Sequence, residues 1–208
     1  MYQFTRRVRI AGSAASAIPF SVGMGKLVTK ITGQPVSTWS SVFSPGAGTI
    51  AWGTFAPDLK TLQDMMDTLQ ADKTFQAESE KGREMFIPGS MDDGLAQVVH
   101  GNPDPSSNPQ YVAVVHATCA PGKLVQGMTA GVEIAQHVEK ATGHPTMFLA
   151  RNTGPFGGVT WLTPYDDVTT MERAEQAFYG DSAVLDFIDS TTTAYLPDGT
   201  QTIFRRLA

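Results

Sequence analysis

Four histidines and a single cysteine are the side chains of this sequence that could carry proton transfer, metal binding or nucleophilic attack. An imidazole titrates near neutral pH, so it can act as a general base or hold a metal or haem iron. Cys119 has no second cysteine to pair with, which excludes an intramolecular disulfide and suits a reducing compartment. A zinc site needs three or four converging ligands. This supply is thin, so we expect no metal site.

The elements that position these residues come from an internal duplication. The segment Lys26 to Pro35 (KLVTKITGQP) resembles Gln136 to Pro145 (QHVEKATGHP), and each ends in Thr-Gly-x-Pro. The two copies then run in step through the following pairs: Trp52 and Trp161, Thr54 and Thr163, Asp58 and Asp167, Thr61 and Thr170, Asp72 and Asp181, and Pro88 and Pro197. A repeat of this length fixes the architecture before any detail is considered.

Hydrophobic periodicity predicts the same element order in both copies. In the first copy we expect strands at 6–11, 36–44, 49–55 and 95–100, with helices at 24–31, 59–69 and 73–85. In the second copy we expect strands at 111–118, 146–152, 158–163 and 203–207, with helices at 128–141 and 168–179. Gly33 can adopt the left-handed conformation after a helix and Pro35 cannot continue it, so both are stop signals. The Pro45-Gly46-Ala47-Gly48 stretch reads as the turn between two strands.

Residues that differ between the copies are the internal pointer to a site. If Val8 and Ile10 are aligned with Val114 and His116, a strand position changes from isoleucine to histidine. On the first helix, Leu27 corresponds to His137. We therefore predict His116 and His137 as catalytic residues that converge with Trp161 between the sheet and the first helix of the second half. The alternative is that each histidine is merely hydrogen-bonded or solvated, and a register slip of one residue would turn His116 to the other face.

Three further residues of the second half are candidates for substrate binding. Arg151 and Asn152 end a strand beside the glycine-rich stretch 153–158, where polar side chains can orient an oxyanion. Tyr165 follows the next strand and could donate a phenol hydrogen bond, although it could equally pack at the surface. Trp161 would line the pocket, or simply fill the core.

Arg7 and Arg9 alternate with Val8 on the first strand and are expected on the face opposite to it. A buried arginine there would need a carboxylate or a ligand.

The order strand, helix, strand, strand, helix, strand is the ferredoxin-like unit. A sheet with both helices on one face leaves the other face uncovered, so two tandem copies can bury these faces against each other. The predicted fold is α+β, with a first repeat at 1–100, a linker at 101–110 and a second repeat, carrying the site, at 111–208.

The whole chain resembles the dimeric α/β-barrel superfamily. The resemblance rests on this element order, on the repeated TG-x-P helix end and on the strand tryptophan. The superfamily includes antibiotic-biosynthesis monooxygenases, EthD-like and NIPSNAP-like proteins and chlorite dismutases. The resemblance implies a cavity for a flat hydrophobic ligand between sheet and helices, and oxygenation or cyclisation without a cofactor. It transfers no catalytic motif.

Composition excludes several other classes of function. A formal net charge of −5 argues against a nucleic-acid partner. No stretch approaches the roughly 18 apolar residues of a membrane span, and Thr5-Arg6-Arg7 precedes too weak an apolar run for an export signal, so we expect a cytoplasmic protein. No P-loop, G-x-G-x-x-G helix start or H-E-x-x-H motif is present.

These observations lead to one expected function and two alternatives. The expected function is a cofactor-independent monooxygenase or cyclase acting on a flat, hydrophobic aromatic small molecule such as a polyketide intermediate. The alternatives are a non-catalytic ligand-binding or assembly protein, and a haem protein with His116 or His137 as axial ligand. A homodimer is the default oligomeric state.

Overall fold

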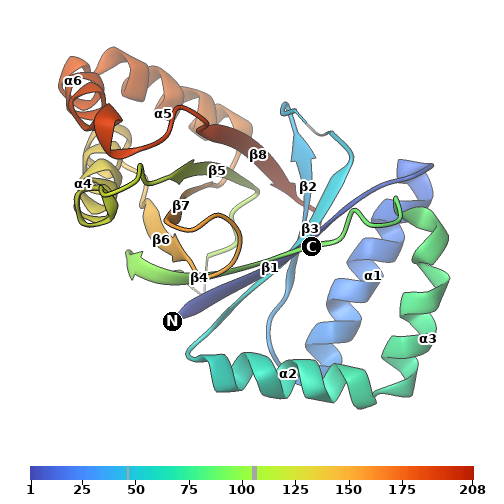
Figure 1. Ribbon diagram of the computed structural model, residues 1–208. Coiled ribbons are helices and arrows are strands. Elements are labelled where there is room, and N and C mark those ends of the chain that lie inside the picture. Colours follow the sequence, from blue (N-terminus) through green and yellow to red (C-terminus); the bar gives the residue numbers. More distant parts are fainter. Residues whose placement is uncertain (46, 105–106) are drawn as a thin grey trace. The chain divides into compact units, whose positions relative to one another are not determined.

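The computed structural model describes residues 1–45, 47–104 and 107–208 (Figure 1). Gly46 of the predicted turn, and Pro105 and Ser106 of the predicted linker, lie outside the described residues.

Both copies have the predicted order of elements. The first contains β1 (Tyr2–Arg9), α1 (Ala14–Thr32), β2 (Ser37–Val42), β3 (Thr49–Ala56), α2 (Leu59–Ala71), α3 (Lys73–Lys81), a short 3-10 turn η1 (Arg83–Met85) and β4 (Asp92–His100). The second contains β5 (Tyr111–Thr118), α4 (Leu124–Thr142), β6 (Met147–Arg151), β7 (Gly158–Tyr165), α5 (Val168–Gly180), α6 (Ser182–Thr191), η2 (Thr192–Ala194) and β8 (Thr200–Arg206). Helix α6 was missing from the predicted second copy. The first helix of each copy also begins earlier than predicted, at Ala14 in α1 and at Leu124 in α4. The additional residues of α1 are mainly Ala, Ser and Gly, which carry little periodic signal.

The strand order is β1-β3-β2-β8-β5-β7-β6-β4, which closes into a barrel. The ladders β1–β3, β2–β3, β5–β7, β6–β7 and β4–β6 are antiparallel. This confirms the predicted α+β fold class and the barrel of two ferredoxin-like repeats.

The chain forms two compact units. Unit 1 consists of Met1–Leu95 together with Arg205–Ala208, and unit 2 consists of Ala96–Phe204. Strand β4 therefore begins in unit 1 and ends in unit 2, and β8 does the reverse. Within unit 1, α1 and α2 pack on the side of the sheet formed by β2 and β3, and α4 packs likewise on β6 and β7 in unit 2 (Figure 1).

Matching caps mark the ends of the duplicated helices. Gly33 and Gly143 follow α1 and α4 with φ angles of 73° and 74°, and their N–H groups donate to the carbonyls of Thr29 and Glu139. These are the predicted left-handed helix ends, a conformation that glycine adopts without strain.

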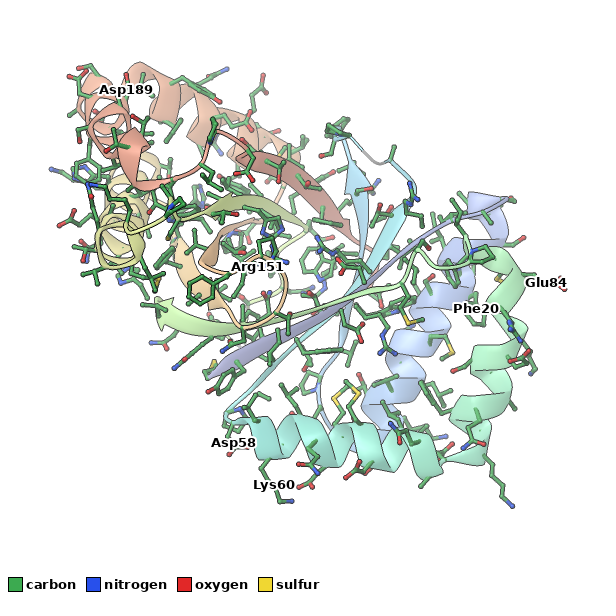
Figure 2. The ribbon with its side chains drawn as sticks, viewed as in Figure 1. Phe20, Asp58, Lys60, Glu84, Arg151 and Asp189 are labelled. Carbon is green, nitrogen blue, oxygen red and sulfur yellow. The ribbon has the colours of Figure 1, made fainter. Side chains whose placement is uncertain are left out.

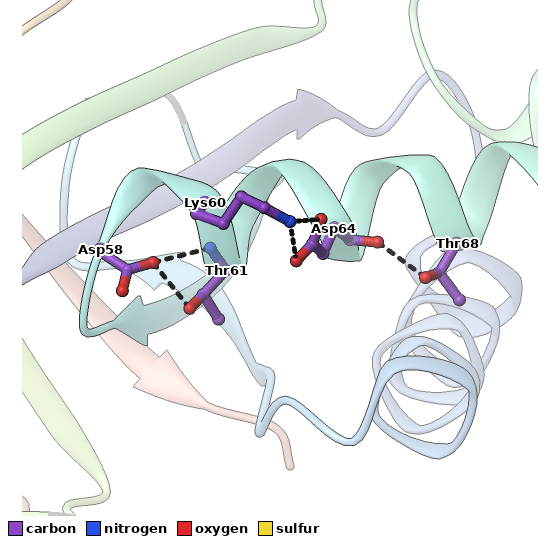
Figure 3. A network of polar contacts seen from close by, with 5 residues as sticks. All are labelled: Asp58, Lys60, Thr61, Asp64 and Thr68. Atoms are coloured by element: carbon purple, nitrogen blue, oxygen red, sulfur yellow. Dashed lines mark hydrogen bonds and ion pairs between the residues drawn. The ribbon is translucent and has the colours of Figure 1, made fainter.

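Equivalent aspartates begin the second helix of each unit. Asp58 accepts a hydrogen bond of 2.8 Å from the backbone N–H of Thr61, and Figure 3 shows this cap together with the exposed Lys60–Asp64 ion pair. Asp167 caps α5 in the same way through Thr170 at 2.7 Å. The hydrogen bonds to the backbone N–H groups lower the pKa of both carboxyl groups.

Among the described residues, every helix is too short or too polar to cross a membrane. The same part of the chain brings no three His, Cys, Asp or Glu side chains together in a way that could hold a metal ion.

Candidate functional site

Unit 1 contains a cavity of about 920 Å³ between its sheet and its helices. This volume lies within the range of small-molecule sites. The wall is mostly apolar and carries five aromatic side chains: Phe4, Phe20, Trp52, Phe75 and Phe86. Four methionines, Met24, Met65, Met66 and Met91, also line it. Such a wall suits a flat hydrophobic molecule, because aromatic rings stack on flat ligands and methionine adapts to irregular shapes.

The cavity has a closed floor and an exposed rim. Val8, Thr54 and Met65 are 3%, 4% and 6% exposed and form part of the floor. Glu80, Arg83 and the segment 87–89 are exposed and form part of the rim. A ligand can thus enter past α3 and reach the sheet.

Trp52 holds the cavity wall to helix α1. Its indole Nε1–H donates to the carbonyl oxygen of Ser21 at 2.9 Å, and its ring meets the edge of Phe86 at a centroid distance of 6.1 Å. Phe20 packs directly on the backbone of Gly82, where a Cβ atom would overlap its ring. Phe20 is labelled on α1 in Figure 2. These contacts fix the aromatic wall in place.

Arg6 brings a positive charge to this apolar wall. Its Nε and Nη2 atoms donate to the two carboxylate oxygens of Asp93 at 2.8 and 2.7 Å. This hydrogen bonding raises the pKa of the arginine, against the opposing effect of burial. A guanidinium has five N–H donors, and three of them have no acceptor among the described residues. Arg6 is therefore held in position with donors to spare for a ligand.

The structure corrects the alignment of the first strands of the two copies. Trp52 pairs with Arg6 across the β1–β3 ladder, and Trp161 pairs with Val115 across the β5–β7 ladder. Arg6 therefore corresponds to Val115. Val8 corresponds to Ala117, and not to Val114 as predicted from the sequence. The isolated bridges Ile10–Phe86 and Cys119–Tyr195 follow the same correspondence.

His116 consequently lies on the face opposite to the one predicted. It pairs with Thr160, the neighbour of Trp161, and its Nδ1 is 2.8 Å from the Thr160 hydroxyl oxygen. Since successive residues of a strand point to opposite faces, His116 and Trp161 point away from each other. The equivalent position in the first copy is Arg7, which pairs with Asp92. The prediction that Arg7 lies on the face opposite Val8 is confirmed, and its side chain is 28% exposed, so Arg7 is ion-paired without being buried.

His137 and Trp161 occupy two further, separate places in unit 2. The His137 ring stacks on Phe187 of α6 with a centroid distance of 4.3 Å and an angle of 16°. Trp161 is 7% exposed and belongs to the core with Cys119, Ala135, Phe148 and Val159. The predicted convergence of His116, His137 and Trp161 is therefore wrong, because the register that placed His116 was wrong.

The other three candidates are also spread over unit 2. The guanidinium of Arg151 lies over the glycine-rich loop, where a Cβ on Gly154 would come within 2.8 Å of Nη2 (Figure 2). Asn152 is exposed. Tyr165 is 6% exposed and packs with Ala113, Met171 and Ala174, and burial raises its pKa to about 12.

Equivalent core positions carry side chains of different size in the two units. Phe148 is fully buried and packs on Trp161 with a ring-centroid distance of 5.2 Å and an interplanar angle of 37°, whereas the corresponding residue of unit 1 is the smaller and likewise fully buried Thr38. Helix α4 lies on Phe148 through Gly131, where a Cβ would overlap the ring. Trp161 donates to the carbonyl of Gly131 at 2.8 Å, the counterpart of the Trp52–Ser21 bond. The two units share this contact between the strand tryptophan and the first helix. The cavity described here, however, lies in unit 1, the copy that the sequence comparison treated as apolar core.

Arg6 is the residue that sequence reasoning missed. The sequence did contain a signal, because the first copy has a charged residue, Arg6, at the position where the second copy has the apolar residue Val115. It was hidden by the strand alignment.

Comparison with known proteins was made at two levels. The sequence matches no family model and no curated protein. Solved structures do match over the whole chain. A candidate monooxygenase from Fusobacterium nucleatum superposes with a TM-score of 0.73 at 8% identity, covering 100% of this chain and 92% of its own. An anthrone oxidase-like protein gives a TM-score of 0.69 at 12% identity, covering 99% and 90%. A candidate chlorite dismutase gives 0.53 at 12% identity, covering 99% and 95%. This chain has the dimeric α/β-barrel fold. At these identities the likeness concerns the fold alone.

Proposed function

We propose that this protein is a cofactor-independent monooxygenase that binds a flat, hydrophobic molecule with an acidic oxygen in the cavity of unit 1. The observation that carries the proposal is the placement of Arg6, a fixed cation with spare donors, in a wall that is mostly aromatic and apolar. Among the structural neighbours described above, one is named as a candidate monooxygenase and another as anthrone oxidase-like.

The cavity would assist the removal of a proton from the substrate. A ring CH₂ group conjugated with a carbonyl gives an enolate when it loses a proton, and the negative charge resides largely on oxygen. Arg6 would stabilise this oxyanion by hydrogen bonds from its free N–H groups, and the low polarity of the wall would strengthen them. Among the lining residues the one carboxylate is Glu80, which stands at the rim and is ion-paired with Arg83 at 3.1 Å. It is the lining carboxylate that could pass the proton to solvent.

The oxygenation balances without an added reductant. The enolate transfers electrons to O₂, a carbon–oxygen bond forms, and the O–O bond breaks with loss of water. The CH₂ group becomes a ketone, one oxygen atom enters the product, and the substrate supplies all four electrons. Cyclisation, the other reaction predicted from the sequence, also begins with an enolate but consumes no O₂.

One observation favours non-catalytic ligand binding as a second candidate. None of the residues lining the cavity is a histidine, and its carboxylate is exposed and paired. A protein that only carries its ligand needs no base.

The haem alternative fits the cavity less well. Histidine, cysteinate and tyrosinate are common axial ligands of haem iron, and the lining residues include none of them; the lining does include methionines, but methionine ligates haem iron together with a histidine. His116 and His137 lie in unit 2, in contact with Thr160 and Phe187. We derive no step through haem.

Oxygen uptake tests the proposal. Anthrone is a three-ring ketone with an acidic CH₂ group, and wild-type protein should consume one O₂ for each anthraquinone formed. The double variant Arg6→Gln/Asp93→Asn should lose this activity, since it removes the cation without leaving Asp93 unpaired. The variants His116→Ala, His137→Ala and Tyr165→Phe examine the predicted site in unit 2. Loss of activity in these three and not in the Arg6 variant would move the site to unit 2. Binding without O₂ uptake would favour the carrier.

A further inference from the structure

Thr54 lies on the cavity floor with a hydroxyl group that has no hydrogen-bond partner among the described residues. The residue is 4% exposed. A buried hydroxyl without a partner costs free energy, so most native structures satisfy such groups. This one therefore needs a reason.

In unit 2 the equivalent hydroxyl is satisfied by a neighbouring side chain. The counterpart of Thr54 is Thr163, whose hydroxyl lies 3.0 Å from that of Thr146. Thr146 stands three residues after the helix-ending Gly143, and the residue at the same distance from Gly33 is Val36. Val36 lines the cavity and cannot accept or donate a side-chain hydrogen bond. One copy thus has a threonine pair, and the other has a valine in place of one member, so the hydroxyl of Thr54, a residue that lines the cavity, has no partner among the described residues.

Thr54 and Arg6 are neighbours on one face of the sheet. Thr54 pairs with Phe4, and Arg6 pairs with Trp52, so the two lie diagonally across the β1–β3 ladder. Diagonal neighbours of this kind stand roughly 7–8 Å apart at their Cα atoms. Both line the cavity.

We infer that Thr54 and Arg6 together select the ligand: Thr54 donates to a neutral oxygen such as a carbonyl, and Arg6 binds an anionic oxygen on the same flat frame. The ligand class is then an aromatic or polycyclic molecule with at least two oxygen substituents. This inference rests on the proposed function for the location of the ligand, but it does not depend on whether the ligand is oxygenated. An oxygen atom of the ligand is then the hydrogen-bond partner of the Thr54 hydroxyl that the Val36 side chain cannot provide.

Two fluorescent or absorbing probes separate the two contacts. Anthraquinone-2-carboxylate has both the carboxylate for Arg6 and ring carbonyls for Thr54, whereas anthracene-2-carboxylate has the same frame and carboxylate without the carbonyls. Titration calorimetry should show that wild-type protein binds the quinone roughly three- to tenfold more tightly, the contribution of one neutral hydrogen bond.

Three variants test which hydroxyl is responsible. Thr54→Val should abolish the preference for the quinone. Val36→Thr should weaken the preference as well, because a threonine at this position can form a hydrogen bond with the Thr54 hydroxyl, as Thr146 does with that of Thr163. Thr38→Val is the matched control: Thr38 is the second buried threonine without a partner among the described residues, but it is not among the residues that line the cavity. This variant should keep the preference.

The possible failures are distinct. If wild-type protein binds both probes equally, or if Thr54→Val keeps the preference, the inference about Thr54 is overturned while the cavity still binds aromatic anions. If neither probe binds, the proposed function fails and the inference fails with it.

Discussion

The same substitution should have opposite effects on stability at the two equivalent threonines of the duplicated sheet. We expect Thr54→Val to stabilise the ligand-free protein and Thr163→Val to destabilise it. The two residues share a place in the fold and similar burial, 4% and 7% exposed. They differ in the partners of their hydroxyl groups. The hydroxyl of Thr163 is hydrogen-bonded to that of Thr146, whereas the hydroxyl of Thr54 has no partner in the described part of the chain.

The magnitudes follow from the hydroxyl groups involved. Removing the unsatisfied hydroxyl of Thr54 should recover part of its desolvation cost, about 1–2 kcal/mol, and the added methyl group is buried. Removing the hydroxyl of Thr163 breaks the bond and leaves Thr146, itself 2% exposed, without that partner, which should cost about 1–3 kcal/mol. The two variants should therefore differ by roughly 2–5 kcal/mol in the free energy of unfolding.

Urea unfolding of the ligand-free protein measures both changes. Thr38→Val, which also removes a hydroxyl without a partner, should behave like Thr54→Val. If Thr54→Val destabilised the protein as much as Thr163→Val, the Thr54 hydroxyl would already have a partner, and the reasoning that assigns it to a ligand would be refuted.

Three other predictions concern activity, packing and pH. The double variant Arg6→Gln/Asp93→Asn should lower oxygen uptake with anthrone as substrate roughly a hundredfold, the usual effect of losing an oxyanion donor. His116→Ala should leave the oxygen uptake unchanged, and a loss confined to His116→Ala would contradict this prediction. Gly131→Ala should destabilise the protein by about 1–3 kcal/mol in urea, because its Cβ overlaps a buried ring, whereas Gly23→Ala, in an open position of α1, should stabilise it by about 0.5–1 kcal/mol; equal effects would show that the ring moves aside. Burial raises the pKa of Tyr165 from 10.0 to about 12, so the folded protein keeps a proton that the unfolded chain loses over this range. Stability should fall between pH 10 and pH 12, and Tyr165→Phe should lessen this fall in urea titrations made at each pH.

Sequence reasoning predicted the architecture because several independent signals agreed. The repeated Thr-Gly-x-Pro ends, the aspartate caps and the paired tryptophans each mark one point of the chain in both copies, and the structure confirms the helix ends at Gly33 and Gly143. Local physical chemistry is sufficient at such points, since a left-handed residue followed by proline ends a helix in any context.

The site was harder to predict because it depends on strand register. Val8 and Val114 were aligned as apolar residues, but apolar residues occur on both faces of these strands, so hydrophobicity alone leaves the register open. Cross-strand pairing with Trp52 and Trp161 settles it and brings Arg6 to the cavity wall. Volume is the second reason. Whether a space is hollow or filled depends on residues from several elements, since the cavity of unit 1 is lined from β1, β3 and the helices α1, α2 and α3, and no single segment contains that information.

The division of the chain has a consequence for the order of synthesis. The backbone of Thr38 in β2 is hydrogen-bonded to Leu207 and Ala208, which belong to the same compact unit but follow the whole of unit 2 in the sequence. During translation, nearly all of unit 1 and then all of unit 2 are therefore synthesised before the residues that complete unit 1. Until then one edge of β2 lacks these backbone partners, and an unpaired strand edge is a template for aggregation. The half of the protein that we propose to be functional is therefore synthesised in two parts, one before and one after unit 2.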